Sequence, residues 1–334
     1  MNGAMRWATL SFRLHRWEVA ASVVGVLLLT AAMAWFAWQL QVIAADQLAC
    51  ERAASPSGCE LIANRYLETS EWGSRLLYLS WGAPFGMGLL LGVPLVAREV
   101  ESRTSAIAWT LSRSRLAWLA SRVAFLGLVL VLLLAAIAVA SEALATALLP
   151  TLDLDADFTW HGRRGCLVVA RGLAALGIGL CLGAVIGRAL PALLAAAFAS
   201  ALVFTAVSIW MDRWNETEAR VTAFDFGPEG SSGLDGGLML GSRVELPSGE
   251  LVGWDEIVRI SDQQMVDMDG AIYTSFDELT GEPDPSSLIG WDRMLVVPGS
   301  MYPTIVLRES GVVAGVAVLF GLLAARVVVR RRLG

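Results

Sequence analysis

Val123-Ala-Phe-Leu-Gly-Leu-Val-Leu-Val-Leu-Leu-Leu-Ala-Ala-Ile-Ala-Val-Ala-Ser-Glu-Ala-Leu-Ala-Thr-Ala-Leu-Leu149 is an apolar run with one charged residue, Glu142. A helix of about 20 such residues crosses a hydrocarbon core of about 30 Å. Five similar runs lie on either side of it, and the chain has a mean hydropathy of +0.60. The sequence therefore predicts an all-α polytopic membrane protein with six transmembrane helices, near residues 19–42, 76–97, 120–148, 166–187, 191–210 and 304–328.

The distribution of arginine predicts which way the chain crosses the membrane. An even number of spans puts both termini on one side, together with the segments 1–18, 98–122 and 326–332 and the residue Arg188. These parts hold 3, 5, 4 and 1 arginines, and short basic segments favour the cytoplasmic side. We therefore expect a multi-pass protein of the cell membrane with both termini cytoplasmic. The residues before the first span, Trp7 to Trp17, predict an amphipathic helix that anchors the chain at the membrane surface.

The chain is predicted to have three parts. Residues 1–210 hold the first five spans, and residues 302–334 hold the sixth span and a cytoplasmic basic tail. Between them, residues 211–301 contain 18 Asp and Glu against five Arg, which indicates a hydrated, acidic extracellular cap. Within this cap, residues 243–254 alternate around a Pro-Ser-Gly turn and predict a β-hairpin. A helix is expected to begin at Trp254 and a loop to cover Gly227 to Gly241, so we predict a small mixed α/β insertion between spans 5 and 6.

The composition excludes several classes of enzyme. All 25 basic residues are arginine, so the chain lacks the lysine that P-loop nucleotidases, kinases and pyridoxal enzymes require. It has two histidines and four cysteines, and none of them has the spacing of a standard zinc site. We therefore expect no catalytic, metal or cofactor site in this chain, and no nucleic acid partner.

Three ionisable residues inside or near the spans are candidate functional residues, because charge is costly in a membrane. Glu142 either lines a polar path or reaches the outer interface. Arg308 and Glu309 either pair with each other or hold the cap. Cys50 and Cys59 flank a polar turn on the expected outer side, where a disulfide can form. Glycines at four-residue spacing, including Gly88 with Gly92 and Gly179 with Gly183, favour close helix packing within the chain.

The segment from Arg98 to Arg122, which we call the elbow, joins the second and third spans. It carries five arginines, and Val100, Ile107 and Leu111 fall on one face at helical spacing. This pattern suits a helix that lies on anionic lipid headgroups. It suits equally a helix that docks on a partner protein, and the periodicity alone leaves both open.

The elbow resembles a known family, the type-2 ABC export permeases of high-GC Gram-positive bacteria. The resemblance rests on Val93-Pro-Leu-Val-Ala-Arg-Glu-Val-Glu101, on Arg103-Thr104, and on Ala108-Trp-Thr-Leu-Ser-Arg-Ser-Arg-Leu-Ala-Trp118. It covers about residues 1–210 and 300–334. Arg103 stands where the family often has Gly, and Leu111 where it often has Gln. Residues 211–301 show no such likeness.

The resemblance implies a permease subunit of an ATP-driven exporter of a small molecule, lipid or peptide. Its elbow would dock on a separate ABC ATPase, present in two copies, which would bind ATP and Mg, and a second or sister permease would complete the pathway among the membrane lipids. The elbow residues implicated in this contact are Arg98, Glu99, Val100, Glu101, Arg103, Thr104, Ile107, Trp109, Leu111, Arg113 and Arg115. The alternative from the residues alone is a membrane enzyme or a ligand-binding sensor that acts through the acidic loop.

Overall fold

The computed structural model describes residues 16–52, 59–102, 114–150, 152–223, 236–260, 265–266, 271–273, 275 and 287–330. The chain divides into two compact units. The helical unit is drawn from Met1–Thr151, Trp160–Val207 and Val306–Gly334, and the insertion unit from Leu152–Thr159 and Ser208–Ile305.

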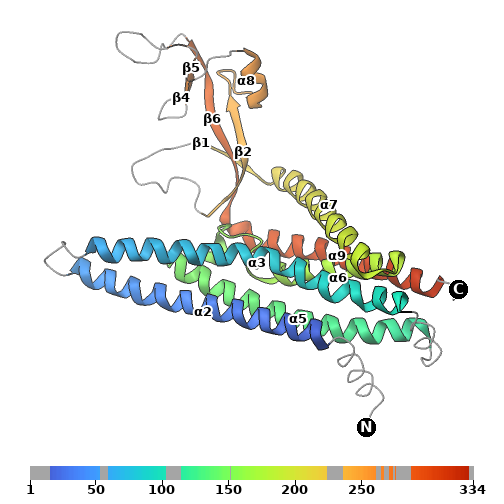
Figure 1. The fold of residues 1–334 in the computed structure, drawn as a ribbon. Helices are drawn as coiled ribbons and strands as arrows, with labels where there is room; N and C mark the ends of the chain where they lie inside the picture. The colour runs from blue at the N-terminus through green and yellow to red at the C-terminus, as the bar shows by residue number, and fades with distance from the viewer. Residues whose placement is uncertain are drawn as a thin grey trace. The chain divides into compact units, whose positions relative to one another are not determined.

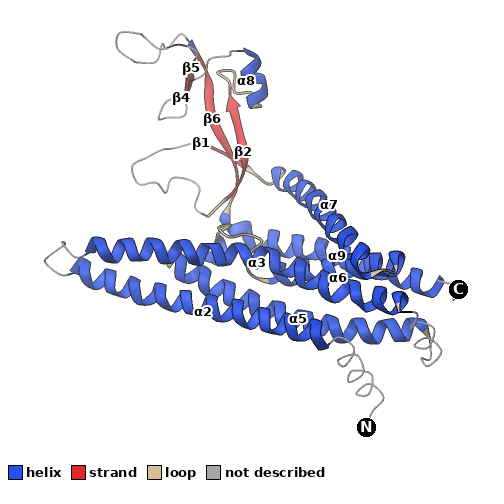
Figure 2. Cartoon of the chain, viewed as in Figure 1, coloured by secondary structure: helices blue, strands red, loops and turns tan. Residues whose placement is uncertain are grey.

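Six helices of the described chain are long and apolar enough to cross a membrane. They are α2 (Arg16–Arg52), α3 (Cys59–Glu101), α5 (Arg115–Leu148), α6 (Cys166–Ile186), α7 (Ala189–Glu216) and α9 (Tyr302–Arg330), and Figures 1 and 2 show their course. A strand-containing insertion follows the fifth of them. The predicted fold class is thus confirmed. The expected N-terminal amphipathic helix falls almost wholly outside the described residues, as do residues 103–113 of the elbow and 331–334 of the basic tail.

The first two helices extend well past their apolar spans. α2 continues to Arg52, and α3 begins at Cys59, although the sequence analysis placed a loop around these cysteines. Charged residues lower the hydropathy there, but Ala, Leu, Glu and Arg are good helix formers and keep the backbone helical. A disulfide joins Cys50 to Cys59, with 5.8 Å between their Cα atoms. The two helices therefore form one covalently closed hairpin.

α3 and α6 pack so closely that their backbones meet. A Cβ atom on Gly92 would lie 2.6 Å from the carbonyl oxygen of Leu176, and one on Gly183 would lie 2.7 Å from that of Val93. Only glycine permits this approach, and the four-residue spacing keeps the glycines on one face. Gly187, four residues after Gly183, has a different role, because it ends α6 in the left-handed conformation with φ 68°.

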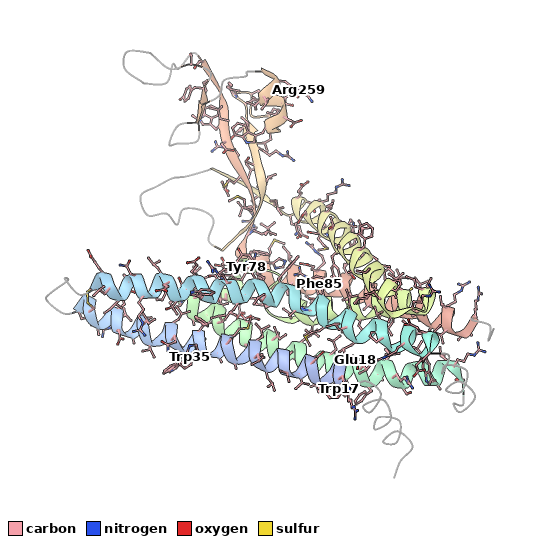
Figure 3. The ribbon with its side chains drawn as sticks, in the orientation of Figure 1. Trp17, Glu18, Trp35, Tyr78, Phe85 and Arg259 are labelled. Atoms are coloured by element: carbon pink, nitrogen blue, oxygen red, sulfur yellow. A yellow bond between two sulfur atoms is a disulfide. The ribbon has the colours of Figure 1, made fainter. Side chains whose placement is uncertain are left out.

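One face of α5 forms the centre of the helical unit. Leu126, Leu130 and Leu134 are fully buried against α2, α3 and α6, while Leu128 and Leu132 on the opposite face are exposed. An exposed apolar face of this kind suits contact with lipid. Trp17 and Trp35 extend outward from α2 in the same way (Figure 3).

The insertion unit is built on a small antiparallel sheet. Its strands are β1 (Arg220–Ala223), β2 (Leu238–Glu245), β3 (Leu251–Val252), β4 (Met265–Val266), β5 (Ala271–Tyr273) and β6 (Leu288–Val297). The order is β3-β2-β6-β5-β4, and β1 also pairs with β6. The helix α8 (Trp254–Ile260) packs its Ile257 against Val244 and Ile272, which form a small buried core.

The predictions for this insertion are confirmed in part. β2 and β3 pair as the expected hairpin, and α8 begins at Trp254 as expected. The predicted loop from Gly227 to Gly241 is wrong at its end, because residues 238–241 belong to β2. A β-bulge between Met239 and Gly241 lets the glycine enter the strand. Residues 227–235 of that loop lie outside the described part.

Candidate functional site

The two ends of the elbow are joined by a buried ion pair. Arg122 of α5 donates to Glu99 of α3, and its guanidinium also stacks over the ring of Trp118 at 4.7 Å. The side chain of Arg122 is 3% exposed. A buried arginine is stable only when its charge is paired, and Glu99 supplies the opposite charge. The pair therefore fixes how α3 leaves the helical unit and how α5 re-enters it.

Three further contacts connect this region to the other helices. Arg98 pairs with Glu18 of α2. Glu101 accepts a hydrogen bond from the backbone nitrogen of Ala189 at 3.0 Å, at the start of α7, and Arg115 donates to the carbonyl oxygen of Val329 at 3.2 Å, in the last turn of α9. A carboxylate at the start of a helix and a cation at the end of one also favour the helix dipole. We call Arg98, Glu99, Glu101, Arg115 and Arg122 the elbow base.

A second polar cluster lies where α6 and α9 begin. Glu309 of α9 binds both His161, at 2.7 Å, and Arg171 of α6, at 2.9 Å. Arg171 also donates to the carbonyl oxygen of Gly162 at 2.6 Å. Gly162 has φ 76°, and a Cβ atom there would lie 2.7 Å from the Arg171 guanidinium. The loop before α6 is thus shaped so that one carboxylate can hold the loop, α6 and α9 together.

The same loop is attached to α3 and α5. Arg164, whose side chain is 1% exposed, pairs with Glu142 of α5 at 2.7 Å. The hydroxyl of Ser80 in α3 donates to the carbonyl oxygen of Arg163 at 2.7 Å. The Arg163 guanidinium stacks 3.8 Å from the ring centre of Tyr78, a residue labelled in Figure 3. These contacts hold the loop in a defined conformation against α3 and α5.

Both clusters consist mainly of arginines paired with carboxylates, and arginine stays protonated at any accessible pH, so it cannot act as a tuned base. The second cluster also contains His161, whose Nε2 is bonded to Glu309. In the part of the chain that the structure describes, no group of three or more His, Cys, Asp and Glu residues could hold a metal ion. What the two clusters can do is connect helices firmly at each end of the helical unit.

Residues 21–213, more than half of the chain, match the family described as ABC-2 membrane transporter related. The chain belongs to this family. It is therefore the membrane component of an ABC transporter, a multi-pass permease of a family that works with an ABC ATPase partner. No curated protein and no solved structure shows significant similarity to the chain.

The structure places the residues that the sequence analysis proposed for this permease in three groups. Of the elbow residues, Arg98, Glu99, Glu101 and Arg115 make the internal contacts described above, and Val100 packs beside the main core. Glu142 and Glu309 each pair with a cation of the loop or of α6, and Arg308 is half-buried in α9. The rest of the elbow set lies outside the described residues: Arg103, Thr104, Ile107, Trp109, Leu111 and Arg113.

The partners of these residues are not predicted by the sequence patterns. They are Glu18, His161, Arg164 and Arg171. Arg171 offered a usable signal, because it is an arginine inside an apolar segment, where an unpaired charge is costly. His161 and Arg164 carry no comparable sequence signal, because they lie in a polar loop and their contacts depend on how that loop folds.

Proposed function

We propose that this permease couples ATP hydrolysis in a separate ABC ATPase to the export of a small molecule, lipid or peptide, and that the elbow transmits the movement. The observation that carries the proposal is the elbow base. Its five side chains connect the elbow to α2, α7 and α9 and connect α3 to α5. A displacement of the elbow would therefore reach all of these helices together.

The proposed cycle follows from these contacts. ATP and Mg would bind to the ATPase, and its closure would shift the elbow that docks on it. Because Glu101 and Arg115 bond to the end turns of α7 and α9, the shift would change the position of these two helices against α3 and α6. A ligand or nucleotide can shift such an equilibrium only through different contacts in the two states, and the elbow contact would provide that difference.

The proposed assembly contains two ATPase copies and two permeases, either identical or sister chains, in the cell membrane with both termini cytoplasmic. The concentration of arginine near the ends of α3, α5 and α9 supports this orientation. Only 17% of the most apolar window of α7, and of α9, is buried within the chain. The remaining surface of these two helices is available for contact with lipid or with a second permease.

Co-purification with an ABC ATPase of the same genome, beginning with any encoded beside the permease, tests this function. The variant R103E/R113E should no longer co-purify with the ATPase, because it reverses two charges on the elbow. The variant E99Q/R122Q should still bind the ATPase but lose ATP-driven transport. Glu99 was expected at the ATPase contact, but the structure turns it inward onto Arg122, and their side chains are only 14% and 3% exposed. R188E is the matched control, since Arg188 is an exposed arginine outside the elbow.

Two outcomes would overturn the proposal. If R103E/R113E binds the ATPase as well as the unaltered chain does, the elbow does not dock on it, and an interfacial helix on lipid becomes the better interpretation. If the unaltered, folded permease binds none of the ABC ATPases of its genome, ATP coupling through a separate subunit fails as well.

A further inference from the structure

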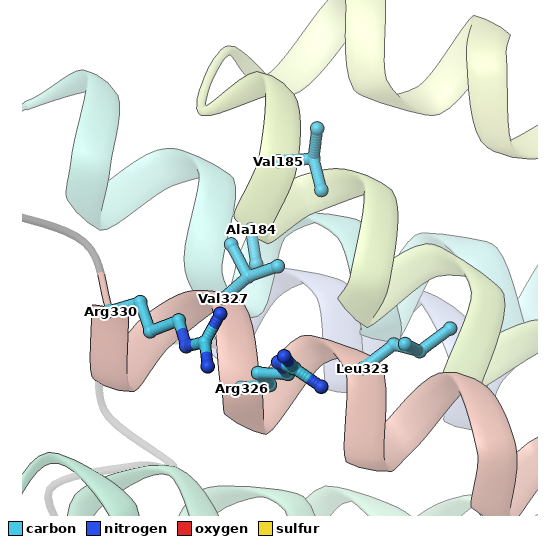
Figure 4. Close-up of a pocket in the computed structure, with 6 residues that line it drawn as sticks. All are labelled: Ala184, Val185, Leu323, Arg326, Val327 and Arg330. Carbon is cyan, nitrogen blue, oxygen red and sulfur yellow. The ribbon is translucent and has the colours of Figure 1, made fainter.

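An open pocket of about 410 Å³ lies between the last turns of α6 and α9. Ala184 and Val185 line it from α6, and Leu323, Arg326, Val327 and Arg330 line it from α9 (Figure 4). Both guanidinium groups extend along α9 toward its N-terminal end, Arg330 toward Arg326 and Arg326 toward Leu323. The pocket thus combines two cations with an apolar wall.

The charges of these two arginines are not compensated by the described parts of the chain. Arg326 and Arg330 are exposed, and neither forms an ion pair with a carboxylate among those residues. The acids of the neighbouring elbow base are engaged elsewhere, Glu99 with Arg122 and Glu101 with the start of α7. The pocket is therefore ready for an anion from outside the chain.

We propose that this pocket binds an anionic phospholipid of the leaflet that the chain termini face. Arg326 and Arg330 are one helical turn apart, so both can donate to the phosphate oxygens of one headgroup. Leu323 and Val185 would contact the upper part of an acyl chain. Basic pockets between membrane helices near the headgroups are suited to such lipids.

The apolar wall distinguishes a lipid from a free phosphate. An inorganic phosphate would use only the two guanidinium groups and would leave Ala184, Val185, Leu323 and Val327 in contact with water. A lipid covers these side chains while its phosphate meets the arginines. The position in the last two turns of a membrane-spanning helix also places the pocket near headgroup depth.

Occupancy of this pocket would act on the elbow base. The carbonyl oxygen of Val329, which accepts the hydrogen bond from Arg115, lies between Arg326 and Arg330 in the sequence. A lipid held by these arginines would restrain the same turn of α9. The binding itself requires no ATPase, so its test is independent of the proposed coupling.

Native mass spectrometry of the full chain in detergent tests the proposal, with phosphatidylglycerol and phosphatidylcholine of identical acyl chains as probes. The unaltered chain should bind one phosphatidylglycerol molecule at least about tenfold more tightly than phosphatidylcholine, because two arginines attract the anionic headgroup. R326Q/R330Q should remove this preference. R16Q/R188Q, which removes two exposed arginines outside the pocket, should keep it. L323Q should lower the affinity for phosphatidylglycerol, and it should not raise the affinity for phosphatidylcholine.

Three results would overturn the lipid site. The first is equal affinity of the unaltered chain for the two lipids, a comparison that does not depend on the folding of any variant. The second is an equal loss of preference in R326Q/R330Q and in R16Q/R188Q, which indicates general surface charge. The third is competition by inorganic phosphate at the concentration of the lipid, because a site for free phosphate gains nothing from the acyl chain.

Discussion

Arg122 donates to Glu99 across the elbow, so that two side chains 23 residues apart in the sequence close this segment at its base. The pair lies at the junction of α3 and α5, and Trp118 covers the guanidinium. The pair therefore holds the last turn of α3 against the first turns of α5, which are the two described ends of the elbow.

Removing one partner of this pair should destabilise the permease more than removing both. R122Q leaves the poorly solvated carboxyl group of Glu99 without its cation, and breaking a buried pair from one side costs about 3 kcal/mol or more. E99Q/R122Q leaves two neutral amides that can hydrogen bond, and its loss should be clearly smaller. Thermal unfolding of E99Q, R122Q and the double variant in one detergent measures the coupling. Additive losses would show that the pair contributes no interaction of its own.

Gly162→Ala should damage the loop before α6 in two ways. The residue has φ 76°, which costs an alanine about 1 kcal/mol, and the new Cβ would also meet the Arg171 guanidinium at 2.7 Å. Gly249→Ala is the control for a positive φ alone, because Gly249 has φ 81° in the turn between β2 and β3 and open space around it. Thermal unfolding should therefore show a greater loss for G162A than for G249A. Equal losses would mean that Arg171 moves aside freely.

The insertion unit should become more stable on mild acidification, because Asp292 takes up a proton. Burial raises the pKa of Asp292, although a hydrogen bond from Trp254 opposes this in part. The folded unit thus binds this proton more readily than the unfolded chain, so the Asp292 contribution destabilises the fold above the raised pKa. That destabilisation is relieved as the pH falls through the raised pKa toward the ordinary value of about 4.

Amide hydrogen exchange of β2 and β6 between neutral pH and pH 4, corrected for the intrinsic rate, measures this effect. D292N keeps an acceptor for Trp254 but does not titrate, so it should be the more stable chain at neutral pH. The difference between the two chains should shrink as the pH falls. A constant difference across this range would exclude Asp292 as the titrating group.

The disulfide offers a test of orientation. If the Cys50–Cys59 end of the α2–α3 hairpin is outside the cell, a membrane-impermeant reductant added to intact cells should expose two thiols to an impermeant maleimide. The chain should carry C166S, because Cys166 is free and exposed, whereas Cys181 is buried. Lysed cells give the full signal for comparison. Labelling that appears only after lysis would reverse the proposed topology.

The sequence predicted the elements whose signal is local. Six apolar runs each contain enough residues to span a membrane. The hairpin of β2 and β3 is predicted by the residues of its turn, where Gly249 has φ 81°. Hydropathy does not predict the extensions of α2 and α3, because it falls where charged residues begin while helix propensity does not. Hydropathy therefore located the spans and missed the true helix ends.

The partners within the polar clusters depend on tertiary packing. Glu309 and His161 are 148 residues apart, and no periodicity connects them. Glu309 was identified as a candidate because a carboxylate in an apolar segment is conspicuous. Its binding partners follow only from the contact of α9 with α6 and from the course of the loop before α6.

The glycine-mediated contact between α3 and α6 limits how such a permease can move. Where Gly92 and Gly183 bring two backbones together, one helix cannot slide past the other without first separating from it, because the carbonyl groups of each interlock with the surface of the other. We therefore expect α3, which leads directly into the elbow, and α6 to move together. Near the start of α6, Arg171 holds the carboxylate of Glu309, so a movement of α6 would also act on α9.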